Sequence, residues 1–222
     1  MITLINAIEV SPLAYAKYPP EDYELPSAEE YPDPEEWHEK WEESASKLNF
    51  NFKPIEKGSP LVDIENIDDG NLQMIIEGRL ADRDPDDPDG GEFMLAFDGG
   101  LVLKQDNQVH IHPNCCGDMS DIQNWKNIFE NKTSEWALLW IGHPWVLYKR
   151  ENGIISFSEY TESNAEDLKD IKITVEIEET ELRTQLDTAI QRQFDFKNRL
   201  LMMLTGMRIE NAENISKMLS GM

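Results

Sequence analysis

The dipeptide Asn152-Gly153 constrains the fold more than any other feature of the sequence. It joins the runs 146–150 (VLYKR) and 153–160 (GIISFSEY), and Asn-Gly is typical of a two-residue β-hairpin turn. Asp98-Gly99-Gly100, between residues 92–97 and 101–105, predicts a second hairpin, because glycine adopts the positive φ angles of tight turns. Strands joined by such short turns pair antiparallel, so the sequence predicts a mainly antiparallel sheet.

Five further segments are predicted to be strands, because apolar residues in them alternate with polar ones or form short runs. They are residues 2–10, 72–80 (LQMIIEGRL), 109–112, 135–142 (EWALLWIG) and 171–178 (IKITVEIE). In the last segment Ile171, Ile173, Val175 and Ile177 are expected on one face. In the first segment, Asn6 interrupts the apolar face formed by Ile2, Leu4, Ile8 and Val10.

A first helix is predicted to begin after Asp33. Asp33 suits the N-cap, Pro34 the first helical position, and Glu36 the third position of a capping box. The apolar residues that follow recur at helical spacing and are predicted to face the core: Trp37, Trp41, Ala45 and Leu48.

Three more helices are predicted later in the chain. Ser120, with Gln123 completing a capping box, is expected to begin one of them. Thr180 is expected to cap a long helix that ends near Gly206, and residues 211–219 form a short one. The apolar stripe expected on the long helix comprises Leu182, Leu186, Ala189, Ile190, Phe194, Leu201 and Leu204. This order of elements predicts a single α+β domain over residues 1–222, with a mainly antiparallel sheet and about three to four helices packed on one face.

Negative charge is concentrated in the first part of the chain. Residues 1–100 hold 25 Asp and Glu against 7 Lys and Arg, within a net charge of −24 for all 222 residues. The predicted sources are an acidic, proline-rich connector at 18–34, the helix that follows it, and an acidic loop at 82–92. Such a surface repels nucleic acid and anionic membranes and attracts basic proteins or cations.

The two cysteines, Cys115 and Cys116, are adjacent and therefore form no disulfide framework. The first residues lack a basic segment of the secretory type, and no apolar run approaches the length of a membrane span. We therefore expect a cytoplasmic protein that does not bind membranes.

Chemically active side chains cluster at residues 110–118. On a strand, His110 and His112 would project from the same face, and Cys115 or Cys116 could follow from the turn. Imidazole and thiol groups are donor types that zinc favours. A thiol before a helix N-terminus could instead act as a nucleophile. The alternative is a surface histidine pair beside two small buried thiols, and the spacing matches no standard zinc motif.

Two other segments invite a functional interpretation. The acidic loop 82–92 offers oxygen donors for calcium, but it has Asp87 and Phe93 where a calcium-binding EF-hand loop needs Gly and Glu. We therefore interpret it as a solvated turn. Trp136, Trp140 and Trp145, with His143, form an aromatic-rich segment that we interpret as core.

These observations favour a non-catalytic acidic interaction protein that binds a basic protein partner. Within that class, a bacterial immunity protein that neutralises a cationic toxin fits best. Phosphate-binding loops and the common hydrolase and kinase motifs are absent from the sequence. The residues predicted to contact the partner are Tyr23, Glu29, Glu30, Tyr31, Glu35, Glu39 and Glu42. The alternatives are a zinc- or thiol-dependent enzyme centred on His110, His112, Cys115 and Cys116, a DNA mimic, and charge that serves solubility alone.

Overall fold

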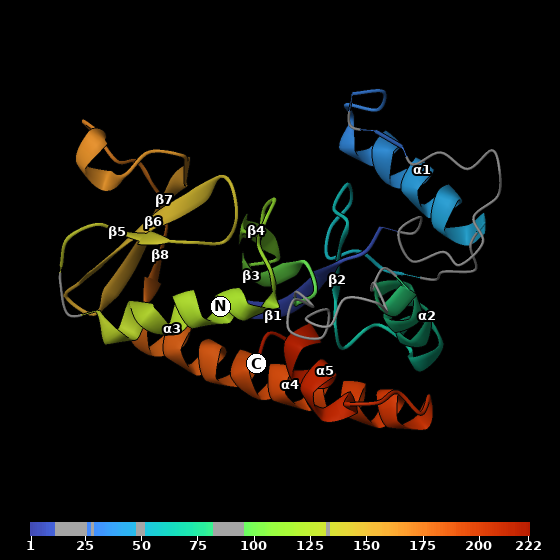
Figure 1. The fold of residues 1–222 in the computed structure, drawn as a ribbon. Coiled ribbons are helices and arrows are strands. Elements are labelled where there is room, and N and C mark those ends of the chain that lie inside the picture. Colours follow the sequence, from blue (N-terminus) through green and yellow to red (C-terminus); the bar gives the residue numbers. More distant parts are fainter. Residues whose placement is uncertain (12–25, 28, 48–51, 82–95, 132–133) are drawn as a thin grey trace.

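The computed structural model describes residues 1–11, 26–27, 29–47, 52–81, 96–131 and 134–222. These residues form an α+β fold with two four-stranded antiparallel sheets (Figure 1), where one sheet was predicted. The first sheet has the order β2-β1-β3-β4 and contains β1 (Ile2–Glu9), β2 (Leu61–Asp63), β3 (Gly99–Gln105) and β4 (Gln108–Ile111). The second has the order β5-β6-β7-β8 and contains β5 (Ala137–Leu139), β6 (Trp145–Glu151), β7 (Ile154–Thr161) and β8 (Ile173–Glu178).

Five α-helices lie in the described part of the chain, slightly more than predicted. They are α1 (Pro34–Lys47), α2 (Asp69–Ala81), α3 (Ile122–Glu130), α4 (Glu179–Gly206) and α5 (Ala212–Leu219). Single 3-10 turns lie at Met119–Asp121 and Ala165–Asp167. None of the described helices combines the length and apolar character needed to cross a membrane.

The hairpin predicted at Asn152-Gly153 is confirmed. Glu151 of β6 pairs with Ile154 of β7, and the two turn residues have φ angles of 53° and 79°. Both angles are positive, as the two-residue turn that matches the strand twist requires.

The hairpin predicted at Asp98-Gly99-Gly100 is wrong. Gly99 and Gly100 belong to β3 and pair with Ile8 and Ala7 of β1. A Cβ on Gly99 would lie 2.3 Å from the Ala7 carbonyl oxygen, so glycine here permits close strand contact. The turn after β3 is Asp106-Asn107, where both φ angles are positive. Phe97 does not pair with β3, and its amide donates to the Leu219 carbonyl at 3.0 Å. Residues 92–95 of the predicted strand lie outside the described residues.

The strand predicted at 72–80 is also wrong, because this segment lies within α2. Leu72, Ile75 and Ile76 are its buried apolar residues, and their spacing of three and four places them on one helical face. Asp68 caps the helix, since its Oδ1 accepts a hydrogen bond from the Asn71 amide at 2.9 Å. The apolar run alone did not distinguish a buried helix from a strand.

The predicted start of α1 is confirmed, whereas the caps predicted for α3 and α4 are wrong. Asp33 Oδ1 accepts from the amides of Glu35 and Glu36 at 2.9 and 3.2 Å. Trp41 and Ala45 are buried and Trp37 is half-buried; Leu48 lies outside the described residues. Asp118, rather than Ser120, forms a capping box with Asp121 at the turn that leads into α3. Thr180 lies inside α4, whose first residue Glu179 is bound by the hairpin turn: its amide donates to the Gly153 carbonyl at 2.9 Å.

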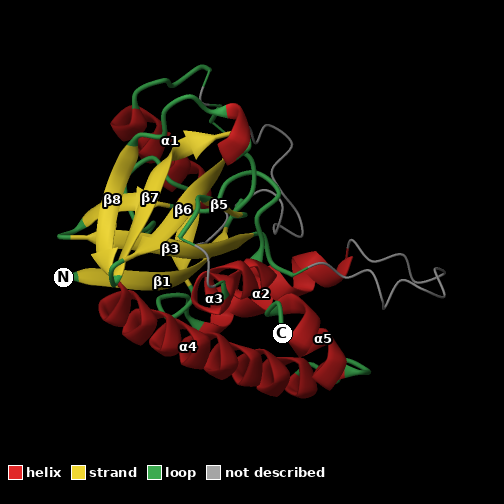
Figure 2. Cartoon of the chain, turned by 90° about the vertical axis from the view of Figure 1, so that its left-hand side faces the viewer, coloured by secondary structure: helices red, strands yellow, loops and turns green. Residues whose placement is uncertain are grey.

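The long helix α4 runs beneath β1 (Figure 2) and contributes residues to two hydrophobic clusters. Its first half belongs to one cluster with residues of both sheets and α3, and its second half belongs to the other with residues of the first sheet, α1, α2 and α5. Its direct neighbours are β1, β8, α3 and α5. Buried polar residues separate the clusters: Asn6 lies between Leu4 and Ile8, and Gln193 donates to the carbonyls of Met119 and Ser220 at 2.8 and 2.6 Å. The buried stripe comprises Leu182, Leu186, Ala189, Gln193, Phe196, Leu200 and Leu204, whereas the predicted Phe194 is 43% exposed.

Other strand predictions are confirmed in position. β4 lies within the predicted 109–112 apart from its first residue, β5 within 135–142 and β8 within 171–178. In β8, Val175 and Ile177 are buried but Ile173 is 46% exposed, so the predicted apolar face is covered only in part. The structure does not describe the acidic loop 82–92 or most of the connector 18–34, so the calcium interpretation lies outside the described residues. The single-domain organisation stays a prediction.

Candidate functional site

Two backbone segments, 112–118 and 141–145, lie against each other and join the two sheets; we call them the paired turns. The Asn114 amide donates to the Ile141 carbonyl at 2.8 Å, and the His143 amide donates to the Cys115 carbonyl at 2.8 Å. The Asn114 side-chain amide donates to the Pro144 carbonyl at 2.7 Å, beside a cis His143-Pro144 peptide bond. These bonds fix the backbone of Asn114 and Cys115 against residues 141–144.

Two glycines make this close approach possible. A Cβ on Gly142, whose φ is 98°, would lie 2.4 Å from the Asn114 carbonyl oxygen. A Cβ on Gly117 would lie 2.7 Å from the Ile141 carbonyl oxygen. Both distances are far below van der Waals contact, so only glycine fits at these positions.

The two cysteines are exposed, which corrects the interpretation of them as small buried thiols. Their sulfur atoms lie 3.5 Å apart, and Cys116 has a φ of 68°. Two effects contribute most to raising the pKa of the Cys116 thiol: the larger is its hydrogen bond with Cys115, and the smaller is the negative charge that Cys115 can carry.

The two predicted histidines lie in different settings. His110 is half-buried within β4. The His112 ring contacts Tyr160, with ring centroids 5.4 Å apart, and its Nδ1 lies 3.0 Å from the Pro113 carbonyl oxygen. Because a carbonyl can only accept, Nδ1 is the donor in this contact. Burial raises the pKa of Tyr160 to about 12, and its hydroxyl accepts from the His112 amide at 2.8 Å.

The four predicted zinc ligands are only partly brought together. The two thiols are in contact, and His112 and Cys115 both line the same pocket, but His110 does not line it. Among the residues that the structure describes, no three His, Cys, Asp or Glu side chains are grouped so that they could hold a metal ion. Zinc binding stays a prediction.

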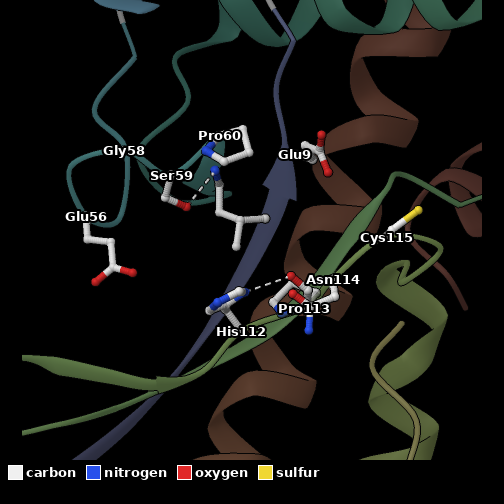
Figure 3. Close-up of a pocket in the computed structure, with 10 residues that line it drawn as sticks. Glu9, Glu56, Gly58, Ser59, Pro60, His112, Pro113, Asn114 and Cys115 are labelled. Atoms are coloured by element: carbon white, nitrogen blue, oxygen red, sulfur yellow. Dashed lines mark hydrogen bonds between the residues drawn. The ribbon is translucent and has the colours of Figure 1, made fainter. Parts of the chain in front are cut away.

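A pocket of about 280 Å³ lies between the loop that precedes β2 and the first of the paired turns (Figure 3). Its lining residues are Glu9, Glu56, Gly58, Ser59, Pro60, Leu61, His112, Pro113, Asn114 and Cys115. Partial burial, followed by the negative charge of Asp98, raises the pKa of the Glu9 carboxyl group. Glu9, Glu56, His112 and Cys115 therefore border one opening. The sequence did not indicate Glu9 or Glu56, because their approach to residues 112–115 depends on strand pairing between distant segments.

Aromatic side chains cover the second of the paired turns. The His143 ring lies 4.6 Å from Trp140 and 5.1 Å from Trp145, measured between centroids. His143 is exposed and both tryptophans are half-buried. The interpretation of these tryptophans as core is therefore wrong in part; Trp125 of α3 is the residue whose indole is fully buried nearby.

The acidic residues predicted to bind a partner lie on α1 and the turn before it. Glu29, Glu30, Glu35, Glu39 and Glu42 are exposed, Tyr31 is half-buried, and Tyr23 lies outside the described residues. Glu35 forms an ion pair with Lys57 at 3.4 Å, and Glu42 Oε1 lies 3.3 Å from His38 Nε2. Within the described part of the chain, Glu29 and Glu39 form no ion pair. Pro34 contacts Gly58, so the start of α1 adjoins the loop that lines the pocket.

Comparison with known proteins found no matching protein family, no similar curated protein and no similar solved structure.

Proposed function

We propose that this protein is a non-catalytic interaction protein that binds a basic protein partner through α1 and the preceding turn. The observation that carries the proposal is the arrangement of charge on α1. Glu35, Glu39 and Glu42 follow one another at intervals of four and three residues, so they share one exposed helical face. Trp41, Ser44 and Ala45 are buried on another side of the helix.

The charge on this face is not required by the packing of the helix. Like charges four residues apart, such as Glu35 and Glu39, destabilise an isolated helix by roughly 0.2–0.5 kcal/mol. Lys40 and Lys47 form ion pairs with Glu43 rather than with these residues. A partner with complementary positive charge would remove the repulsion and would be steered towards the face during association.

Within this class, the proposed partner is a cationic protein such as a nuclease toxin, and the chain would be its immunity protein. An inhibitor of such an enzyme needs to display an acidic surface, and it does not need a catalytic site. Tyr31 is half-buried just before α1 in the chain and would supply the aromatic contact that interfaces favour. The zinc- or thiol-dependent enzyme remains the alternative proposal, and metal analysis of the purified protein tests its zinc form.

The experiment is capture of a basic partner, followed by measurement of association rates at low and high salt. The variant Glu35→Gln/Glu39→Gln/Glu42→Gln should slow association at low salt by on the order of 10-fold. The matched control is Glu162→Gln/Glu166→Gln/Asp170→Asn, which changes the net charge equally at exposed positions between β7 and β8. Equal slowing by both variants would show that bulk charge, and not this face, acts on the partner.

A further inference from the structure

Cys115 and Cys116 are placed in an arrangement that their sequence adjacency alone does not require. Both side chains are exposed and their sulfur atoms lie 3.5 Å apart. We propose that this pair is a redox-modifiable site, which closes to an intramolecular disulfide by exchange with a low-molecular-weight disulfide such as oxidised glutathione.

The backbone conformation supports the pairing. Non-glycine residues with positive φ in the described part of the chain are Asp106, Asn107, Cys116, Asn152, Arg208 and Asn211. Four of these six are Asn or Asp, which tolerate this region, whereas a cysteine there is uncommon. Such a conformation persists only where the surroundings impose it, and it is concentrated at functional sites.

The surroundings that impose it are the paired turns. The Cys115 carbonyl accepts from the His143 amide, and the Gly117 amide donates to the Asn114 carbonyl at 2.9 Å. The backbone on both sides of the pair is therefore fixed while the two thiols remain in solvent. An exposed thiol with a second thiol in contact has the accessibility and the neighbouring resolving cysteine that are common in redox-sensing sites.

The reaction proceeds in two exchange steps that balance. The Cys115 thiolate attacks one sulfur of the small disulfide, forming a mixed disulfide and releasing one small thiolate. The Cys116 thiolate then attacks the Cys115 sulfur, forming the Cys115–Cys116 bond and releasing the second small thiolate. The two protons lost by the protein thiols protonate the two released thiolates. The protein pair is oxidised and the small disulfide is reduced to two thiols.

The product is expected to be easily reduced again. Adjacent Cα atoms are about 3.8 Å apart across a trans peptide, below the roughly 4.4–6.8 Å usual for disulfide-linked residues. The ring therefore carries strain, and strained, exposed disulfides are labile.

Mass analysis of the folded, full-length protein after treatment with oxidised glutathione tests the proposal. Cys115 and Cys116 are the two cysteines of the chain, so every change in thiol mass belongs to them. Wild type should lose two hydrogens and retain no glutathione, and dithiothreitol should restore the original mass. Cys116→Ser, which lacks the resolving thiol, should instead retain one glutathione on Cys115.

Three outcomes would overturn the proposal: wild type that keeps glutathione on one or both thiols, wild type whose oxidised form is a disulfide-linked dimer, or wild type that does not react while Cys116→Ser does. The double variant Cys115→Ser/Cys116→Ser is the control and should show no mass change. Because both side chains are exposed, these substitutions should leave the circular dichroism spectrum unchanged.

Discussion

The acidic face of α1 and the paired turns are held in opposite ways. The acidic face is a row of exposed carboxylates on a helix whose other side supplies Trp41 to the core. The paired turns expose few charges and are fixed by direct backbone hydrogen bonds between residues 112–118 and 141–145. The first region can lose its side chains without loss of packing, whereas the second cannot accept even a methyl group at two glycines. This difference separates a surface suited to electrostatic recognition from one suited to precise placement of reactive groups.

Gly142→Ala tests the rigidity of the paired turns and should have the largest effect. The new Cβ would lie 2.4 Å from the Asn114 carbonyl oxygen at a φ of 98°, so we expect a loss of about 2–4 kcal/mol in the free energy of unfolding. Urea denaturation measures this loss.

The matched control is Gly153→Ala, where φ is 79° but a Cβ would meet nothing within 4 Å. Its loss in the free energy of unfolding should be limited to the roughly 1–2 kcal/mol that a Cβ costs at a positive φ. Equal losses in the two variants would mean that the paired turns yield to the methyl group and are less rigid than the structure indicates.

Asp121, which supports the first of the paired turns, should make stability depend on pH. Burial raises the pKa of its carboxyl group to about 6, above its unfolded value of about 3.9. The neutral form is therefore favoured in the folded state. The contribution of this carboxyl group to the free energy of unfolding is complete below about pH 4 and is lost as pH rises through about 6.

We expect the unfolding free energy of wild type to fall by about 1–2 kcal/mol over that range relative to Asp121→Asn. Urea titrations at several pH values measure the difference. Asp187→Asn, on the exposed side of α4, is the control and should follow wild type. An Asp121→Asn curve parallel to wild type would contradict the assigned cause.

Cys116→Gly tests whether the thiol pair sits on a strained backbone. Glycine adopts a φ of 68° without the steric cost of a Cβ, so stability should rise by about 0.5–1 kcal/mol despite the greater freedom of the unfolded chain. The control Asn152→Gly, at a similar φ of 53°, should gain less because Asn tolerates this region. A loss of stability in Cys116→Gly would argue against strain at the pair.

The smallest effect on stability is expected on α1. Glu35→Gln/Glu39→Gln/Glu42→Gln should change the unfolding free energy by only a few tenths of a kcal/mol, because it relieves like-charge repulsion and also removes the exposed pair with Lys57. Thermal unfolding at low and high salt measures it. A loss above about 1 kcal/mol would show that these carboxylates stabilise the fold, and the contrast between the two regions would then fail.

The sequence predicted the parts of the fold that depend on neighbouring residues. Asp33 and Pro34 begin α1 where expected, since capping involves atoms only two or three residues away. The segment 72–80 was mistaken for a strand because its burial comes from contacts made by α2 with distant elements. At the candidate site, residues 110–118 were identified from their side-chain chemistry. Glu9 and Glu56 were not, and neither was the exposure of the cysteines, because these follow from how remote strands pack.

Sequence by itself therefore determined the Asn152-Gly153 hairpin, the start of α1 and the negative charge that α1 displays. These follow from backbone preferences and ionisation, which act within a few residues or within one side chain. Tertiary structure alone decided that Gly99 lies within a strand and that Gly142 meets Asn114. It also decided that the two thiols lie side by side in solvent. Steric exclusion and burial between segments depend on which surfaces meet, and no local pattern in the chain records that.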